Sequence, residues 1–269
     1  MVQTIPGVLA QIVERKRVEL ETRKHLRSQF ERQAETNLAD RRRFAEALST
    51  ARPAIIAEMK KASPSKGVLS HDFDPRRIAA MYRRGGASAL SVLTDEQFFQ
   101  GRLADLQEAR AEAGLPALRK DFTFDEFHVV ESAAHGTDAI LLIVAILTVA
   151  ELRRYRELAE QYAMDTLVEV HDETELAMAV DSGARIVGVN NRNLHDFSVS
   201  LETSIRIAER IPPEVLKVSE SGIHCQQDVR RLQDAGYQAF LVGEHLMKSG
   251  DPVAALEALR DCEDLRHNQ

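Results

Sequence analysis

Short apolar runs recur along this chain, and most of them end in a residue that could do chemistry or hold an anion. Eight such runs occur, and six have endings of this kind. Helix-like stretches separate them, which indicates alternating strands and helices. If the strands are parallel, their polar endings form one layer at one edge of the sheet. The six endings begin at Glu58, Arg119, Glu169, Asn190, Ser219 and Gly243.

The regular alternation favours an α/β fold in which eight strands close into a (β/α)8 TIM barrel. No G-x-G-x-x-G motif follows the first expected strand, which removes the usual dinucleotide fingerprint. Thr148 precedes Glu151 at capping-box spacing, and glycines follow several expected helices. Strands are expected at 54–60, 89–94, 116–121, 139–145, 166–171, 185–190, 215–220 and 239–243. Helices are expected at 75–85, 102–113, 125–135, 148–162, 173–183, 202–210, 226–236 and 252–261.

The first 50 residues differ from the rest of the chain. Apolar residues between Leu9 and Leu20 follow helical spacing, and a second short helix is expected after the basic cluster 41–43. We expect residues 1–50 to form a helical extension that covers one end of a barrel formed by 54–261, with 1–269 as one domain. The basic clusters are expected to be solvated helix faces.

Composition narrows the class of protein. Of the 269 residues 44% are apolar and 29% are charged, and the net charge of −7 argues against a nucleic-acid binder. No signal-peptide pattern begins the chain, and the apolar run 139–149 is too short to span a bilayer. We expect a soluble cytoplasmic protein without membrane contact. Neither Cys225 nor Cys262 belongs to a C-x-x-C motif, and the nine histidines lack metal-ligand spacing.

Charged residues at the ends of three expected strands are candidates for proton transfer. Glu58 and Lys60 would share one face of their strand, although such a segment taken alone is more often a surface turn with Lys–Glu pairing than a site. Lys120 ends its strand, where burial and neighbouring cations would lower its pKa and make it a usable general acid. A salt bridge to Glu169 or Asp121 is the alternative for Lys120. Glu169 lies between apolar residues, where an unpartnered carboxylate would be costly, which favours a function.

Other positions could bind substrate. Asn190 and Arg192 could hold hydroxyl, carboxylate or phosphate groups. Taken by itself, however, the segment is more simply explained as an Asn-rich turn. Gly222 and Gly243 follow the last two expected strands, where backbone N–H groups commonly hold phosphate in barrels. His171 is interpreted as a loop residue.

Residues 56–67, IAEMKKASPSKG, are very similar to the signature segment of the indole-3-glycerol phosphate synthase family. Nearly the whole chain carries further matches to this family. They are 118–122 LRKDF, 142–144 LIV, 168–170 VEV, 188–194 GVNNRNL, 219–223 SESGI and 241–244 LVGE.

The resemblance implies conversion of 1-(2-carboxyphenylamino)-1-deoxyribulose 5-phosphate to indole-3-glycerol phosphate, with loss of CO₂ and water, in tryptophan biosynthesis. It implies no metal and no cofactor. It assigns Lys120 as general acid for ring closure, and Glu169 to proton transfer in dehydration, assisted by Lys60. Glu58, Asn190 and Ser221 would orient substrate hydroxyls and these catalytic groups. Substrate or phosphate contacts are implied for Ser63, Arg192, Gly222, Gly243 and Glu244, and an apolar wall for Phe99 and Phe122.

Two other functions are alternatives to this one. A phosphoribosylanthranilate isomerase-like barrel would share the glycine phosphate site but favours a Cys/Asp pair at strand ends, whereas both cysteines lie at edges of expected helices. A non-catalytic barrel subunit would be expected to lose Lys60, Lys120 or Glu169, and all three are present. The sequence leaves open whether the chain associates with other enzymes of the pathway.

Overall fold

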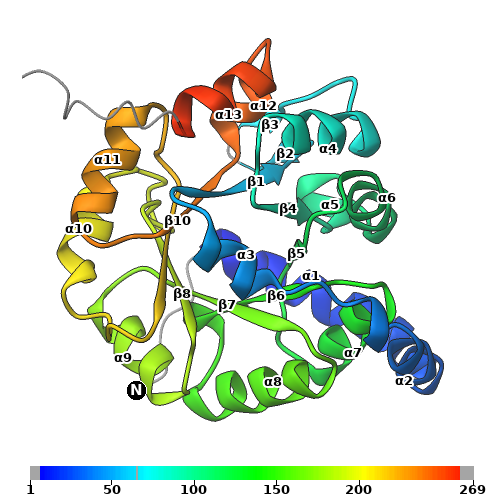
Figure 1. Cartoon of the computed structure of the whole chain (residues 1–269). Coiled ribbons are helices and arrows are strands. Elements are labelled where there is room, and N and C mark those ends of the chain that lie inside the picture. The colour runs from blue at the N-terminus through cyan, green and yellow to red at the C-terminus, as the bar shows by residue number, and fades with distance from the viewer. Residues whose placement is uncertain (1–6, 65, 261–269) are drawn as a thin grey trace, which may run out of the picture.

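A computed structural model describes residues 7–64 and 66–260. The expectations stated for the first six residues and for Cys262 concern residues outside the described ranges. Eight parallel strands form a closed barrel in the order β1-β10-β9-β8-β7-β6-β5-β4, which confirms the predicted TIM-barrel fold (Figure 1). The strands are β1 (Ala54–Met59), β4 (Ala89–Leu93), β5 (Ala117–Lys120), β6 (Ala139–Ile143), β7 (Asp165–Val170), β8 (Ile186–Asn190), β9 (Leu216–Glu220) and β10 (Ala239–Val242).

Helices surround the barrel and connect successive strands (Figure 1). The predicted capping box is present, since the Thr148 hydroxyl accepts from the Glu151 N–H and the Glu151 carboxylate accepts from the Thr148 N–H. None of the helices in the described ranges is long and apolar enough to cross a membrane. The outer helices are α4 (Pro75–Arg84), α6 (Leu103–Ala113), α7 (Glu126–Ala134), α8 (Val149–Gln161), α9 (Glu173–Asp181), α10 (Glu202–Ala208), α11 (Gln226–Asp234) and α13 (Pro252–Arg260).

Several short elements were not predicted, because each is too short to show a hydrophobic period. A small antiparallel hairpin follows the first barrel strand, and short helices follow others. They are β2 (Ala62–Ser63), β3 (Gly67–Val68), α5 (Glu96–Phe99), η3 (Val144–Ile146) and α12 (Glu244–Lys248).

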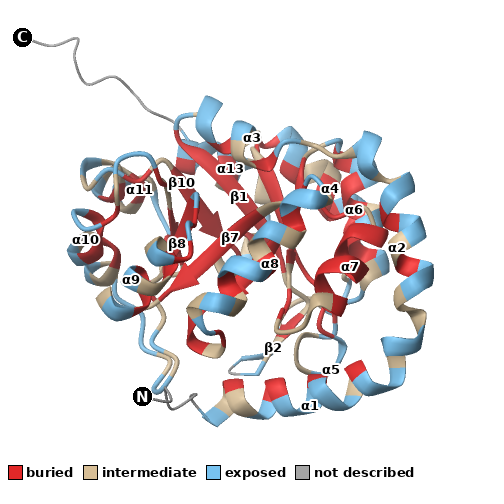
Figure 2. Ribbon diagram, turned by 90° about the horizontal axis from the view of Figure 1, so that it is seen from below, coloured by how far each residue is buried: buried red, intermediate tan, exposed pale blue. Residues whose placement is uncertain are grey.

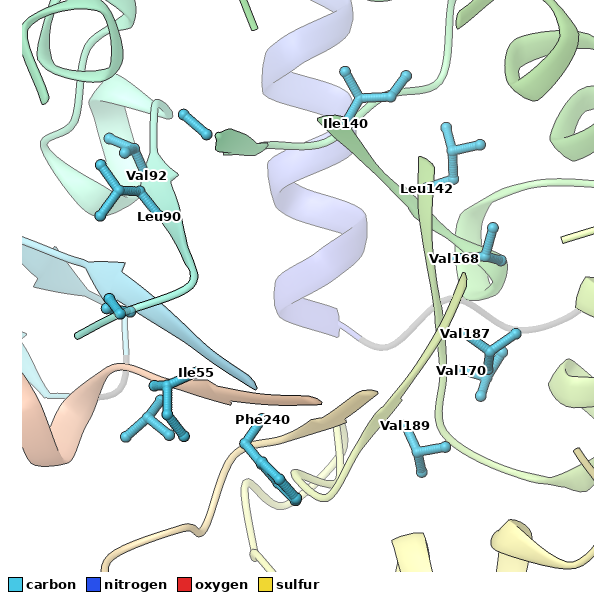
Figure 3. Packing of buried hydrophobic residues seen from close by; sticks show 14 of the residues in the cluster. Ile55, Leu90, Val92, Ile140, Leu142, Val168, Val170, Val187, Val189 and Phe240 are labelled. Carbon is cyan, nitrogen blue, oxygen red and sulfur yellow. The ribbon is translucent and has the colours of Figure 1, made fainter. Parts of the chain in front are cut away.

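Side chains alternate between the two faces of each barrel strand. One face packs outward against the helices, as Figure 3 shows for Ile140, Val168 and Phe240. The neighbouring residues of the other face, including Ile56, Leu118 and Leu167, form a separate cluster inside the barrel. The same alternation continues into the polar strand ends, so it determines which of these residues point inward.

The N-terminal extension contacts both ends of the barrel, so the prediction that it covers one end was wrong. Its first helix, α1 (Gly7–Arg23), bonds through Lys16 to Asp121 just after β5, at the carboxyl end. Its last helix, α3 (Phe44–Thr50), lies at the opposite end, where the Ala45 N–H donates to Asp165 at the start of β7. Figure 2 shows α1 and α3 at opposite ends of the molecule. The connection runs through η1 (Lys24–Leu26), α2 (Arg27–Thr36) and η2 (Leu38–Asp40).

The basic cluster before α3 is not simply a solvated face, which corrects the second expectation for this region. The Arg41 guanidinium donates to the carbonyls of Tyr162 and Ala133, and that of Arg42 donates to the carbonyls of Arg110 and Leu115. Carbonyls at helix carboxyl ends lack partners within the helix, and a cation is favourable there. Arg41 and Arg42 therefore tie the extension to the outer helices, while Arg43 is exposed.

We expect Leu48→Ala to lower the free energy of unfolding by about 2–5 kcal/mol, because it leaves a cavity in the barrel interior. Leu48 is fully buried in α3 beside the amino ends of the strands. Leu38→Ala is the matched control, since Leu38 lies in the same extension but is 39% exposed. Chemical denaturation of both variants measures the difference, and equal losses would contradict the role assigned to α3.

Candidate active site

A cavity of about 700 Å³ opens at the carboxyl ends of the barrel strands. Twelve of the thirteen residues singled out from the sequence line it, and so the structure brings them together. They are Glu58, Lys60, Phe99, Lys120, Phe122, Glu169, Asn190, Arg192, Ser221, Gly222, Gly243 and Glu244. Ser63 lines a neighbouring cavity of about 160 Å³, which it shares with Lys60 and Phe122.

Strand alternation explains why these side chains converge. Below Lys120 on the inner face lies Leu118, and below Glu169 lies Leu167, both members of the interior cluster. Residues two positions apart on a strand share a face, so the charged ends point into the same space as the apolar floor. The site is therefore a polar layer resting on a packed hydrophobic one.

Lys120 is held between two carboxylates. Its Nζ donates to Glu169 Oε2 at 2.7 Å and to Glu220 Oε2 at 2.6 Å. Burial alone would lower the pKa of Lys120, but the carboxylates of Glu169, Glu220 and Glu58 outweigh it and hold the pKa well above its ordinary value. The expectation of a lowered pKa was therefore wrong, because anions rather than cations surround this ammonium.

The two carboxylates differ in their pKa. Burial would raise the pKa of Glu169, but Lys120 and His171 outweigh it and hold it well below its usual range. Burial and repulsion by Glu169 raise the pKa of Glu220 to about 7, against the opposing effect of Lys120. Lys120, Glu169 and Glu220 form a trio of charged groups. In this trio the carboxylate of Glu169 stays ionised at neutral pH, while the carboxyl of Glu220 titrates near neutrality.

Glu220 was not among the residues predicted for the site, although it ends an apolar run. Its importance depends on contact with Lys120, which is 100 positions away in sequence. A small residue makes room for it, since a Cβ on Gly188 would lie 2.1 Å from Glu220 Oε1. A glycine inside a buried strand was the available sequence signal, because it often marks a close approach by another group.

Glu58 and Lys60 share the inner face as predicted, and they also form the ion pair that was the alternative. Lys60 Nζ donates to Glu58 Oε1 at 2.8 Å. Glu58 is buried, whereas the Lys60 side chain is 18% exposed. A Cβ on Gly243 would lie 2.3 Å from Glu58 Oε1, so this glycine leaves space for the carboxylate.

The loops after β9 and β10 form one end of the cavity. Ser221 has a φ of +68° and Gly222 a φ of +79°, and such backbone strain in a non-glycine residue is typical of functional sites. Glu244 would repel an anion, but it pairs with Lys66 at 2.5 Å, Lys248 at 2.8 Å and Arg192 at 3.8 Å. This end of the cavity therefore combines backbone of the two loops with the side-chain cations of Lys66 and Arg192, while Lys248 pairs with Glu244. Lys66 and Lys248 were not among the predicted site residues.

Part of the cavity wall is apolar. The rings of Phe99 and Phe122 lie 6.1 Å apart between centroids at 38°, and Leu9 of α1 and Leu194 also line the space. A flat aromatic group would remove this surface from water. Leu9 was not predicted to belong to the site.

The extension also reaches the charged layer. The buried Lys16 Nζ lies 2.7 Å from Asp121 Oδ1 and 3.4 Å from Asp95 Oδ2. Asp121 accepts further bonds from Arg119 at 3.0 Å and from Thr94 at 2.6 Å. Asp121 follows Lys120 directly, so α1 is tied to the strand end that carries the central cation.

Across residues 7–64 and 66–260, no group of three or more His, Cys, Asp or Glu side chains could hold a metal ion.

A family model described as indole-3-glycerol phosphate synthase matches residues 9–259 of the chain. A relative of that name from Chloroherpeton thalassium is 50% identical over 90% of this chain and 95% of its own length. Another, from Desulfotalea psychrophila, is 55% identical over 76% of this chain and 79% of its own length.

Solved structures with low sequence identity share the barrel fold. Thiamine phosphate pyrophosphorylase from Pyrococcus furiosus has a TM-score of 0.57 at 18% identity, covering 77% of this chain and 94% of its own. N-acetylmannosamine-6-phosphate 2-epimerase from Clostridium perfringens has a TM-score of 0.59 at 15% identity, covering 74% and 89%.

We expect Gly188→Ala to lower kcat by about tenfold or more, because its Cβ would push the Glu220 carboxylate away from Lys120. Displacements of about 1 Å in an active site can cost about 100-fold in rate. Gly250→Ala is the control, since a Cβ there meets nothing within 4 Å. Steady-state kinetics of the two variants compare them, and wild-type turnover in Gly188→Ala would exclude a role for the Glu220–Lys120 contact.

Proposed function

The chain belongs to the indole-3-glycerol phosphate synthase family, and on this premise we propose how its cavity performs the family's reaction. The enzyme is a carboxy-lyase that converts 1-(2-carboxyphenylamino)-1-deoxyribulose 5-phosphate to indole-3-glycerol phosphate in tryptophan biosynthesis. The observation that carries the proposed mechanism is the contact of the Lys120 ammonium with Glu169 and Glu220 at the base of the cavity.

Two parts of the cavity lining suit the two ends of the substrate. The apolar wall of Phe99 and Phe122 suits the aromatic ring, and the backbone around Gly222 and Gly243 suits the phosphate. Arg192, Lys66 and Lys60 add positive charge on the side of the cavity that Ser63 also borders. Binding both ends of the substrate would hold the flexible sugar folded. Such positioning lowers the activation barrier, by as much as about 7–11 kcal/mol in well-oriented reactions.

Ring closure requires an acid beside the ribulose carbonyl. We assign this role to Lys120, whose proton passes to the carbonyl oxygen as the aromatic carbon attacks the carbonyl carbon. Loss of CO₂ then returns the electron pair of the broken bond to the ring and restores aromaticity. A pKa held high makes Lys120 a weak acid at rest. Protonation of Glu220, whose pKa is raised to about 7, would remove one anion from Lys120 and strengthen it as an acid.

Dehydration requires a base and a proton donor. We assign proton removal to Glu169, which is ionised because of its lowered pKa, and we assign Lys60 to assist as the hydroxyl leaves. Glu58 orients Lys60 through their 2.8 Å contact, and Asn190 and Ser221 orient the substrate hydroxyls. Each general acid–base step contributes about 10²–10⁴-fold to the rate.

The substrate class also bears on the setting in which the enzyme works. We propose a cytoplasmic location, because a sugar phosphate is charged and does not cross the apolar core of a membrane, so it stays in the compartment where it is made. We also propose that extension and barrel act as one domain, which the buried contact of Lys16 with Asp121 supports.

The purified protein should develop indole fluorescence when mixed with the carboxyphenylamino-ribulose phosphate in the absence of added metal. Lys120→Ala should lower kcat by about 10²–10⁴-fold, because the acid for ring closure is lost. Lys24→Ala, which removes an exposed cation of η1, is the control. Absence of product from the wild-type protein, or unchanged turnover in Lys120→Ala, would refute the mechanism.

Glu169→Gln should lose kcat by about 10²–10⁴-fold with little change in KM, because proton transfer acts in the transition state. Steady-state kinetics separate the two constants. A rise in KM with unchanged kcat would reassign Glu169 to substrate binding.

A further inference from the structure

His171 connects the active site to a helix outside it. It is the first residue after β7 and lies two positions beyond Glu169, so its side chain follows the same inward direction. Its Nε2 lies 3.4 Å from Glu169 Oε1, and its Nδ1 lies 2.9 Å from Glu175 Oε2. The imidazole therefore stands between two carboxylates, one in the cavity and one in α9.

Glu175 is itself firmly held. It is buried in the first turn of α9, where its backbone N–H donates to the Asp172 carboxylate at 2.8 Å. The same Glu175 Oε2 accepts the backbone N–H of His171 at 2.7 Å. Backbone and ring of His171 are thus bound by a single carboxylate, which leaves the ring little freedom to turn.

The two oxygens of Glu169 have different partners. Oε2 accepts from Lys120 at 2.7 Å, and Oε1 faces His171. We propose that His171, anchored by Glu175, is a positioning residue that places a cation against Oε1 and keeps Glu169 ionised and turned toward Lys120. This inference rests on the role proposed for Glu169 and adds the group that sustains it.

The surrounding charges favour the imidazolium form. Burial would lower the pKa of His171, but Glu169 and Glu175 outweigh it and raise the pKa to about 10. Glu169 in turn faces Lys120 of β5, with Glu220 of β9 and Glu58 of β1 close by. A polar cavity of about 350 Å³ borders His171 and is lined by Asp172, Arg192, His195 and Arg206 among others. Among the described residues, the ion pairs of the His171 ring are those with Glu169 and Glu175, so these two glutamates dominate its pKa.

A purely structural role of His171 would lead to different experimental results. If His171 only braced the start of α9, its removal would lower thermal stability and leave the pH dependence of catalysis unchanged. If it holds Glu169 ionised, its removal raises the pKa of Glu169. The ionised base is then lost at a higher pH, so the acid limb of the kcat profile moves upward.

Nitrogen-15 NMR of histidine-labelled, ligand-free enzyme tests the charge directly. We expect the His171 ring to remain an imidazolium at about pH 8, where a histidine of ordinary pKa near 6.5 is neutral. The signal is identified by its absence from His171→Gln. Glu175→Gln should lower the pKa of this ring. A neutral His171 at that pH would overturn the proposal whatever the role of Glu169.

Kinetics test the consequence. His171→Gln keeps an amide donor without charge, and we expect its acid limb to move up by about one pH unit or more with KM nearly unchanged, since an opposite charge at this range lowers a carboxyl pKa by about 1–3 units. Glu175→Gln should move the limb in the same direction. Glu173→Gln is the matched control, because Glu173 lies in the same helix as Glu175 but pairs at the surface with Arg206 of α10.

The outcomes distinguish the positioning role of His171 from the catalytic role proposed for Glu169. An unmoved acid limb and unchanged kcat in His171→Gln, with Glu169→Gln inactive, would refute the positioning role alone. A fully active Glu169→Gln would refute the role of Glu169 and the inference with it. Should Glu175→Gln not fold, His171→Asn provides a second uncharged variant for the same profile.

Discussion

The site depends on one buried cation, the Lys120 ammonium, and on the two carboxylates that hold it at 2.6 and 2.7 Å. A lone charge in this position would be strongly unfavourable, so the trio is stable only as a unit. Strand alternation brings its members together from β5, β7 and β9, and Gly188 leaves the space that Glu220 occupies. The same contacts that permit the charge to be buried also set the proton affinities that the reaction uses.

Further charges support this trio on two sides. Lys16 of α1 bonds Asp121, the residue after Lys120, and His171 lies against Glu169. The N-terminal extension therefore belongs to the architecture of the site, to which it also contributes Leu9. The barrel places the reacting groups, while α1 and α9 constrain the strand ends that carry them.

The sequence was sufficient for the barrel, because turn glycines, helix caps and apolar runs are local signals. Residues that end inward-facing runs, such as Lys60, Lys120 and Glu169, were found for the same reason. The direction of the Lys120 pKa shift could not be predicted, because it depends on how closely Glu169 and Glu220 approach the ammonium, and Glu220 is 100 residues distant in sequence. The partners of His171 and Lys16, and the contact of the extension with both barrel ends, are likewise tertiary. Burial and pairing across distant segments decide these features, and neither leaves a local pattern.

The protonation of Lys120 in the free enzyme tests the central claim most directly. Nitrogen-15 NMR of lysine-labelled protein, with Lys120 assigned by substitution, follows its Nζ through an alkaline titration. Because two carboxylates surround the ammonium, its pKa should lie above the ordinary value of 10.5. It should also fall when Glu169 or Glu220 is replaced by glutamine. A Lys120 that is a neutral amine near pH 8 would contradict this account of the site.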